Sequence, residues 1–225
     1  KTPSCVDNTQ NQGESGIDCG GPCPYLCTEQ MQAPVVRFTQ ARTNANGTTD
    51  VIAYVDNPNQ GAYARNVAYS VSLYGADHTL GAPIQKGTID LPPGASVPVF
   101  LPNISSGNKP IVSAFLTIDS STIKWQAGND TRVLPVVGSA TLGGTTALPR
   151  VTAVLNNPSA LALSNVKVIL ALFDTAGNVL DVSQTIVPSI PAQGSASATF
   201  TWNTPFAEAP VRVDVLPIIP LAPGS

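Results

Sequence analysis

Hydrophobic and polar residues alternate along much of the chain with a period of two. From Val67 to Leu73 every second residue is a large apolar side chain, with Ala or Ser in between. Residues 166–172 have the same alternation of large apolar side chains, with Lys167, Ile169 and Ala171 in between. Such alternation predicts β-strands that bury one face. Short segments rich in Gly, Pro, Asn and Asp separate the apolar runs, as at 56–61 and 156–159. We therefore expect an all-β fold of antiparallel strands, each about five to eight residues long.

The chain also contains an internal repeat about one hundred residues long. The segment that begins at Pro34 aligns with the segment that begins at Pro135, with apolar positions and turn residues in the same order. The matched positions are Asn57 and Pro58 with Asn157 and Pro158, Asn66 and Val67 with Asn165 and Val166, Leu73 and Tyr74 with Leu172 and Phe173, and Phe100 with Phe200. This ordered agreement predicts two copies of one domain.

The repeat and the turn signals divide the chain into four parts. We expect two tandem immunoglobulin-like antiparallel β-sandwiches, residues 34–125 and 126–217, with about seven strands each. A Cys-rich knot, residues 1–33, precedes them, and a Pro-rich extended tail, residues 218–225, follows. Because proline donates no ladder hydrogen bond, each Asn-Pro pair is expected to end a strand at the edge of a sheet.

All four cysteines lie between residues 5 and 27. Their intervals of 13, 3 and 3 intervening residues differ from the paired Cys-x2-Cys spacing of zinc and redox sites. The spacing therefore predicts disulfides among Cys5, Cys19, Cys23 and Cys27, and three pairings are open. Gly20 and Gly21 are expected to supply the positive φ angles of a tight crosslinked turn.

Four oxygen-bearing side chains recur at intervals of three to four residues inside the same segment. They are Asp7, Asn11, Glu14 and Asp18, and hard oxygen donors on a short loop suit calcium. The spacing differs from that of an EF-hand loop. The same residue types also cap local backbone without any ion. Calcium binding and backbone capping are both open at this stage.

Composition excludes several classes of function. Charged residues make up 11% of the chain, the net charge is -3 and no Lys/Arg cluster occurs, so a nucleic-acid partner is not expected. The apolar runs have the length of strands, well below the roughly 20 residues of a membrane-spanning helix. The chain begins at Lys1 and contains one Met, so we expect a removed amino-terminal signal or anchor. With an even number of clustered cysteines, this favours an extracellular or cell-surface location.

The sequence offers little for catalysis. Its one histidine, His78, lies in the turn segment 75–81, whereas a Ser-His-Asp or Cys-His site needs an enclosed and oriented histidine. Asp residues such as Asp119, Asp130, Asp174 and Asp181 lie near turns, where Asp caps backbone. We therefore expect a protein that is not an enzyme.

The second repeat resembles the FxLYD and CARDB type of immunoglobulin-like module found in bacterial envelope proteins. The shared pattern is a strand ending in Asn, "NV" opening the next strand, an aromatic-Asp-x-x-Gly hairpin, and a Pro/Gly turn before a final aromatic strand. The knot pattern C-x-D-x-x-x-N-x-x-E-x-x-x-D-C-G-G-P-C, followed by "VIAYVDNPN", is similar to that of uncharacterised surface-anchored bacterial proteins. The resemblance implies location and architecture, and no activity.

Two functions are compatible with these expectations. The first is an extracellular structural protein, meaning a stalk, surface-layer element or filament subunit that associates with itself or with neighbouring surface proteins. Strand addition at a sandwich edge is one means of assembly. The alternative is an adhesin-like module that binds carbohydrate or a protein partner through loops at one end of a sandwich.

Overall fold

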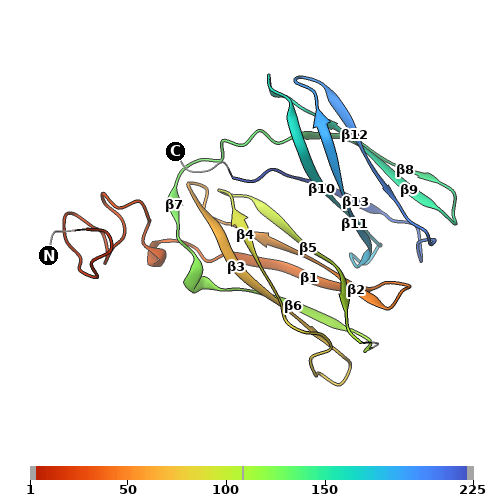
Figure 1. Cartoon of the computed structure of the whole chain (residues 1–225), viewed down its shortest axis with the longest axis horizontal. Coiled ribbons are helices and arrows are strands. Elements are labelled where there is room, and N and C mark those ends of the chain that lie inside the picture. The colour runs from red at the N-terminus through yellow and green to blue at the C-terminus, as the bar shows by residue number, and fades with distance from the viewer. Residues whose placement is uncertain (1–3, 108, 222–225) are drawn as a thin grey trace. The chain divides into compact units, whose positions relative to one another are not determined.

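The computed structural model describes residues 4–107 and 109–221, and its regular structure is almost entirely β (Figure 1). The helical elements among these residues are the 3-10 turns η1 (Thr28–Gln30) and η2 (Ser120–Thr122). None of the described helical turns is long and apolar enough to cross a membrane. The predicted all-β fold is confirmed, whereas residues 222–225 of the predicted tail lie outside the described residues.

The first repeat contains six main strands in two sheets. One sheet has the order β1-β2-β5 and the other the order β4-β3-β6. The strands are β1 (Val35–Thr43), β2 (Thr48–Asp56), β3 (Ala62–Tyr74), β4 (Gln85–Leu91), β5 (Ser96–Ser105) and β6 (Ser113–Ile118). A two-residue strand, β7 (Gln126–Ala127), pairs with the start of β3.

The second repeat has the same design. Its sheets have the orders β8-β9-β12 and β11-β10-β13, so each strand has a counterpart at the same place in the first repeat. The strands are β8 (Val136–Gly144), β9 (Pro149–Asn156), β10 (Leu163–Phe173), β11 (Val179–Ile190), β12 (Ser195–Thr201) and β13 (Arg212–Ile218). Each repeat thus has six main strands among the described residues, where about seven were predicted.

The core of the second repeat lies between its two sheets. Its members come from alternate positions of β9, β10 and β12 and from β11, and they include Leu155, Leu170 and Phe200, which are all almost fully buried. Several strands exceed the predicted five to eight residues, since β3 has 13 and β11 has 12. In β3 Asn66 (φ 50°) lies in the left-handed region at a register irregularity with β4, after which the strand continues. Its counterpart in β10, Asn165 (φ 52°), has the same conformation, but the register with β11 is unchanged there.

The two Asn-Pro pairs occupy equivalent places in the repeats. Asn57 and Asn157 are each 2% exposed, directly after the ends of β2 and β9. The predicted strand ends are therefore confirmed, but the predicted edge position is wrong, because β2 and β9 are the middle strands of their sheets. Each proline follows the last ladder residue, so its missing donor removes no ladder hydrogen bond.

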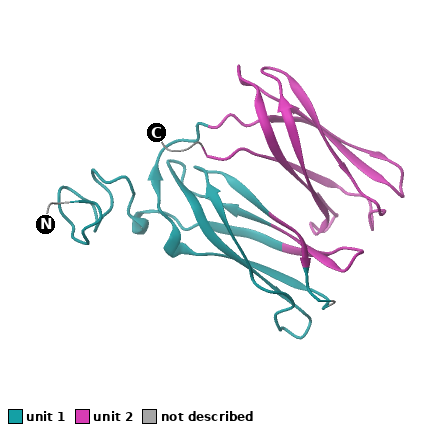
Figure 2. Cartoon of the chain, in the orientation of Figure 1, with its two compact units in different colours: residues 1–39, 53–99, 105–131 teal, residues 40–52, 100–104, 132–225 magenta. Residues whose placement is uncertain are grey.

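The described structure groups into two compact units, residues 1–39, 53–99 and 105–131, and residues 40–52, 100–104 and 132–225 (Figure 2). The border between the units crosses β1, β2 and β5. The predicted boundaries at 33, 125 and 217 stay a prediction.

Candidate functional site: the disulfide knot

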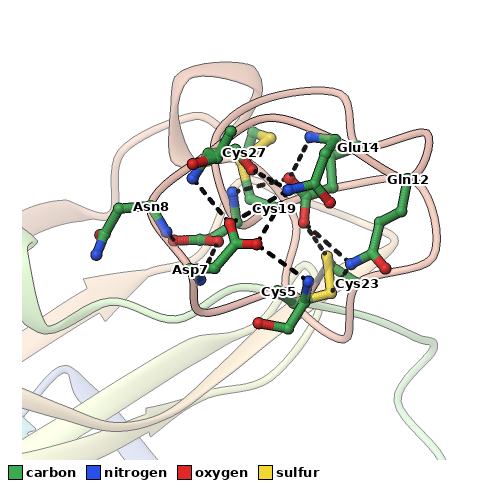
Figure 3. The surroundings of a disulfide bond; sticks show 12 residues. Cys5, Asp7, Asn8, Gln12, Glu14, Cys19, Cys23 and Cys27 are labelled. Atoms are coloured by element: carbon green, nitrogen blue, oxygen red, sulfur yellow. Dashed lines mark hydrogen bonds between the residues drawn. A yellow bond between two sulfur atoms is a disulfide. The ribbon is translucent and has the colours of Figure 1, made fainter. Parts of the chain in front are cut away.

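The four cysteines form two disulfides, Cys5–Cys23 and Cys19–Cys27 (Figure 3). The predicted crosslinking is confirmed, and the structure selects one of the three possible pairings. Among the described residues no cysteine is free. The knot therefore offers neither a thiolate for a metal nor a redox-active thiol in this state.

Glycines allow the chain to pass closely around these disulfides. Gly20 (φ 69°) and Gly21 (φ 56°) have the positive φ angles that their sequence predicts. A Cβ atom on Gly21 would collide with the carbonyl group of Gly13. A Cβ atom on Gly16 would lie 2.9 Å from the Sγ atoms of both Cys19 and Cys27. The backbone thus approaches both itself and a disulfide too closely for a side chain.

The predicted calcium ligands lie in one hydrogen-bonded network. The carboxylate of Asp18 accepts hydrogen bonds from the backbone N–H groups of Asp7 and Asn8, both at 2.9 Å. The carboxylate of Asp7 accepts from the backbone N–H of Thr9 at 3.0 Å and from the Asn11 side-chain amide at 3.1 Å. The structure therefore brings Asp7, Asn11 and Asp18 together as the spacing suggested.

Glu14 is the buried member of this network, at 6% exposure (Figure 3). Its carboxylate accepts hydrogen bonds from the backbone N–H groups of Asn11 at 3.2 Å and Asp18 at 3.3 Å, and from the Gln12 side-chain amide at 3.4 Å. One of its oxygens also lies 3.1 Å from Cys23 Sγ, a disulfide sulfur without a proton to donate. The Glu14 carboxylate thus links the backbone at Asn11 to the backbone at Asp18 in the centre of the knot.

The carboxylates of Asp7, Glu14 and Asp18 thus each accept hydrogen bonds from backbone N–H groups of the knot, as capping side chains do. Two sets of potential ligand atoms lie within 4.8 Å of one another among the described residues, namely Glu14 with Cys5 and Cys23, and Glu29 with Cys19 and Cys27. Both sets depend on disulfide sulfurs, and neither contains Asp7 or Asp18. One oxygen in the network, Asn11 Oδ1, is buried without a hydrogen-bond partner in the described structure. Calcium binding stays a prediction.

The carboxyl end of the knot is attached to the first repeat within the same compact unit. The backbone N–H of Leu26 donates to the carbonyl of Trp125 at 2.8 Å, and Trp125 is 1% exposed. Gln32 and Asn59 exchange two hydrogen bonds, from Gln32 N to Asn59 Oδ1 at 2.9 Å and from Asn59 Nδ2 to the Gln32 carbonyl at 2.8 Å. These contacts fix the segment that leaves the second disulfide.

Of the residues weighed for catalysis, His78 and Asp174 lie in turns. Asp181 lies within β11, is 4% exposed and forms an ion pair with Arg42 at 2.8 Å, and its burial raises the pKa of its carboxyl. His78 is exposed, with a φ of 58°, between β3 and β4. Its neighbour Asp77 accepts hydrogen bonds from the backbone N–H and hydroxyl of Thr79, which hold the pKa of that carboxyl below its usual value. The Asn178 side chain and backbone have the same effect on the pKa of Asp174 between β10 and β11. Asp77 and Asp174 therefore cap hairpins, as their positions suggested.

The structure also shows a pocket that the sequence did not indicate. It lies in the second compact unit, where the β8–β9 hairpin meets residues 206–210, and has a volume of about 490 Å³. Its lining includes Leu142, Pro149, Phe206, Glu208 and Pro210. Phe206 packs edge-to-face on Trp202, with ring centroids 4.9 Å apart. Residues 204–210 contain two prolines and one phenylalanine, a composition that does not by itself predict a pocket.

A second exposed feature lies on the first repeat. The rings of Tyr74 and Phe115 form an edge-to-face pair with centroids 5.9 Å apart, and Phe115 is 58% exposed. Leu80 pairs with Tyr74 through a β-bridge and is 46% exposed. Exposed apolar side chains grouped in this way are typical of surfaces that bind a partner.

Comparison with known proteins leaves the family open. No family model matches the chain, and no curated protein matches it either. Among solved structures, the chain is similar to red sea bream transglutaminase, with 13% sequence identity and a TM-score of 0.30. The match covers 83% of this chain and 29% of the transglutaminase chain.

Proposed function

We propose that the protein is a non-catalytic structural component of a cell surface, built from tandem β-sandwiches as a stalk, surface-layer element or filament subunit. The observation that carries this proposal is the identical sheet order of the two repeats. Repetition of one module extends a structure without adding a reactive site. The turn positions of His78, Asp77 and Asp174 support a role without catalysis, because each side chain serves or occupies a hairpin turn.

The disulfides support an extracellular location. The knot contains little apolar core, since its buried side chains are Glu14 and Cys27, and it depends on two crosslinks for its shape. Crosslinks of this kind persist in oxidising compartments. The knot then serves as a rigid collar ahead of the first repeat.

Electron microscopy of the protein, extracted under mild conditions from the surface of the cells that make it, tests this function. Ordered filaments, stalks or layers that contain the chain are expected. Monomers alone at high concentration would contradict a structural role.

We also propose that the collar binds one calcium ion. The residues that would hold it are Asp7, Asn11, Glu14 and Asp18. The unpartnered Asn11 Oδ1 and the spare lone pairs of the carboxylates support it. Calcium is expected to raise the melting temperature of the intact protein, and a chelator to lower it. The conservative variant Asp18→Asn should abolish this difference, whereas Asp90→Asn on β4 should keep it. An unchanged melting temperature in calcium and in chelator would remove the ion from the account.

An adhesin-like binding module is the second candidate, and two observations favour it. They are the pocket of about 490 Å³ beside Phe206 and the exposed Tyr74–Phe115 pair. Pockets of this size with apolar walls and a few polar groups are typical ligand sites. Titration of the protein with carbohydrates and peptides, with Phe206→Ala and Phe115→Ala as the comparison, separates this candidate from a purely structural role.

A further inference from the structure

Strand β8 forms one edge of the β8-β9-β12 sheet. Residues in register across this sheet form rows that share a face. One row contains Phe200, Val151 and Leu142, in β12, β9 and β8. Phe200 is 2% exposed and Val151 is fully buried, yet Leu142 is 48% exposed. The core of the sandwich therefore ends at β9.

The neighbouring row shows the same change. Ala198 and Ala153 are buried, and Ala140 of β8 is exposed. All nine residues of β8 are exposed, including Val136 at 56% and Val137 at 36%. The core-side residues of β8 are thus exposed in the described structure, although residues 142–144 also line the pocket with residues 206–210. No described strand pairs with the outer row of backbone N–H and C=O groups of β8.

Sheet edges in proteins are usually protected by charged residues, prolines or a cover. Most edge strands here carry such protection: Arg37 and Arg42 in β1, Lys86 and Asp90 in β4, Pro98 and Pro102 in β5, Asp181 and Pro188 in β11, and Arg212, Asp214 and Pro217 in β13. Of the main edge strands that the structure describes, β6, β8 and β12 contain neither charge nor proline. Of these three, β6 and β12 bury their core-side residues, so β8 alone is both unprotected and uncovered.

We propose that β8 is the assembly edge of the protein, and that it pairs in antiparallel fashion with β8 of a second copy about a two-fold axis. This pairing rests on the proposed structural function and specifies the contact through which two copies of the chain associate. The chain has a net charge of -3, whereas β8 contains no charged residue. Two copies can therefore pair at β8 without bringing like charges together at the contact. Backbone groups of the two strands satisfy one another, and Val137 and Leu142 of both copies become covered.

The pairing is centred on Thr141, in the part of β8 beyond its register irregularity at Val137 and Ser139, so that Thr141 of one copy lies opposite Thr141 of the other. A strand that pairs with itself forms an isologous and closed contact, so the expected product is a dimer. The dimer joins two three-stranded sheets into one of six strands. It supplies a building unit for a larger structure without using the other edges.

Matched lysine variants test the contact. Ser139 and Thr141 of β8 lie in the same rows as Ser197 and Thr199 of β12, and all four are exposed. Sedimentation equilibrium of the full chain is expected to show a monomer–dimer equilibrium. S139K/T141K should raise the dissociation constant about tenfold or more, because lysines oppose each other across the two-fold axis. S197K/T199K should leave it unchanged, with equal melting temperatures for both variants.

Three results would overturn the proposal: a monomer at about 1 mM, an unchanged dimer in S139K/T141K, or equal weakening by S197K/T199K. Hydrogen exchange gives a second reading, in which residues 136–144 should be protected in the dimer and not in S139K/T141K. Native filaments that still form with S139K/T141K would refute β8 pairing and leave the structural function standing. A monomeric wild type without any native assembly would refute both.

Discussion

Two buried asparagines show how single residues tie the sandwiches together. Asn157 Nδ2 lies within hydrogen-bond distance of the carbonyls of Leu161, Ile190 and Pro191, at 2.8, 3.2 and 3.0 Å. Its backbone N–H donates to the Gly194 carbonyl at 2.8 Å. One side chain thus joins the loop after β9 to the turn after β11. Asn57 makes the same set of contacts with Ala62, Leu91, Pro92 and Ala95 in the first repeat.

Substitution of this residue should destabilise the fold strongly. Asn157→Ala removes the two amide N–H donors that these three carbonyls share in a buried place, so the free energy of unfolding should fall by about 3 kcal/mol. Asn156→Ala at the adjacent, exposed position should change it by less than about 0.5 kcal/mol. Urea denaturation of both variants makes the comparison. Equal losses in the two variants would show that the buried amide is not a structural tie.

The carboxylates that cap hairpins should make the stability of the fold depend on pH. The backbone N–H and hydroxyl of Thr79 lower the pKa of Asp77 in the folded protein below its value in the unfolded chain. Folding therefore gains stability from Asp77 above the unfolded pKa of about 3.8 and loses it as the pH falls through the folded pKa. Asp77→Asn should lower the urea midpoint at pH 6 and have no effect at pH 2. A difference that is the same at both pH values would contradict this role.

The sequence predicts where the buried asparagines lie but not what they do. The Asn-Pro dipeptide marks the end of a strand because proline restricts the backbone around it. The acceptors of Asn157 Nδ2 at Ile190 and Pro191 are more than 30 residues away, so only the folded sandwich brings them together. Glu14 differs, because its hydrogen-bond donors at Asn11, Gln12 and Asp18 lie within four residues of it in sequence.

At the scale of elements, alternation identified the strands but underestimated their length. β3 continues through Asn66 because an Asn tolerates the left-handed conformation that the irregularity requires. The sequence pattern therefore predicted that the strand starts at Asn66, whereas Asn66 lies inside β3. Alternation also did not reveal the exposure of β8, since exposure depends on what covers a strand in space and not on its own residues.

The knot is the element whose stability depends most on covalent bonds. Reduction of Cys5–Cys23 and Cys19–Cys27 should open residues 4–27 to proteolysis while the strands stay protected, because a loop of about 15 residues loses about 3 kcal/mol with its crosslink. Limited proteolysis with mass spectrometry, with and without reductant, locates the first cuts. First cuts within β9 or β10 would contradict an independently crosslinked knot.

At the scale of the molecule, the repeat in the sequence and the repeat in the fold agree. The aligned Asn57 and Asn157, and Asn66 and Asn165, occupy equivalent places in sheets of the same order. The alignment was informative because turn residues and buried positions repeat together. The pocket beside Phe206 was not predictable in this way, since it arises where the β8–β9 hairpin and residues 206–210 meet in space.

If the chain is a structural subunit of a cell surface, microscopy of the native material should show it in ordered assemblies. Cell-surface extracts labelled with an antibody against the knot should show ordered filaments, stalks or layers, with label at regular intervals. The labelled material should consist of this chain in repeated copies. Label on dispersed monomers only, at high protein concentration, would contradict the claim.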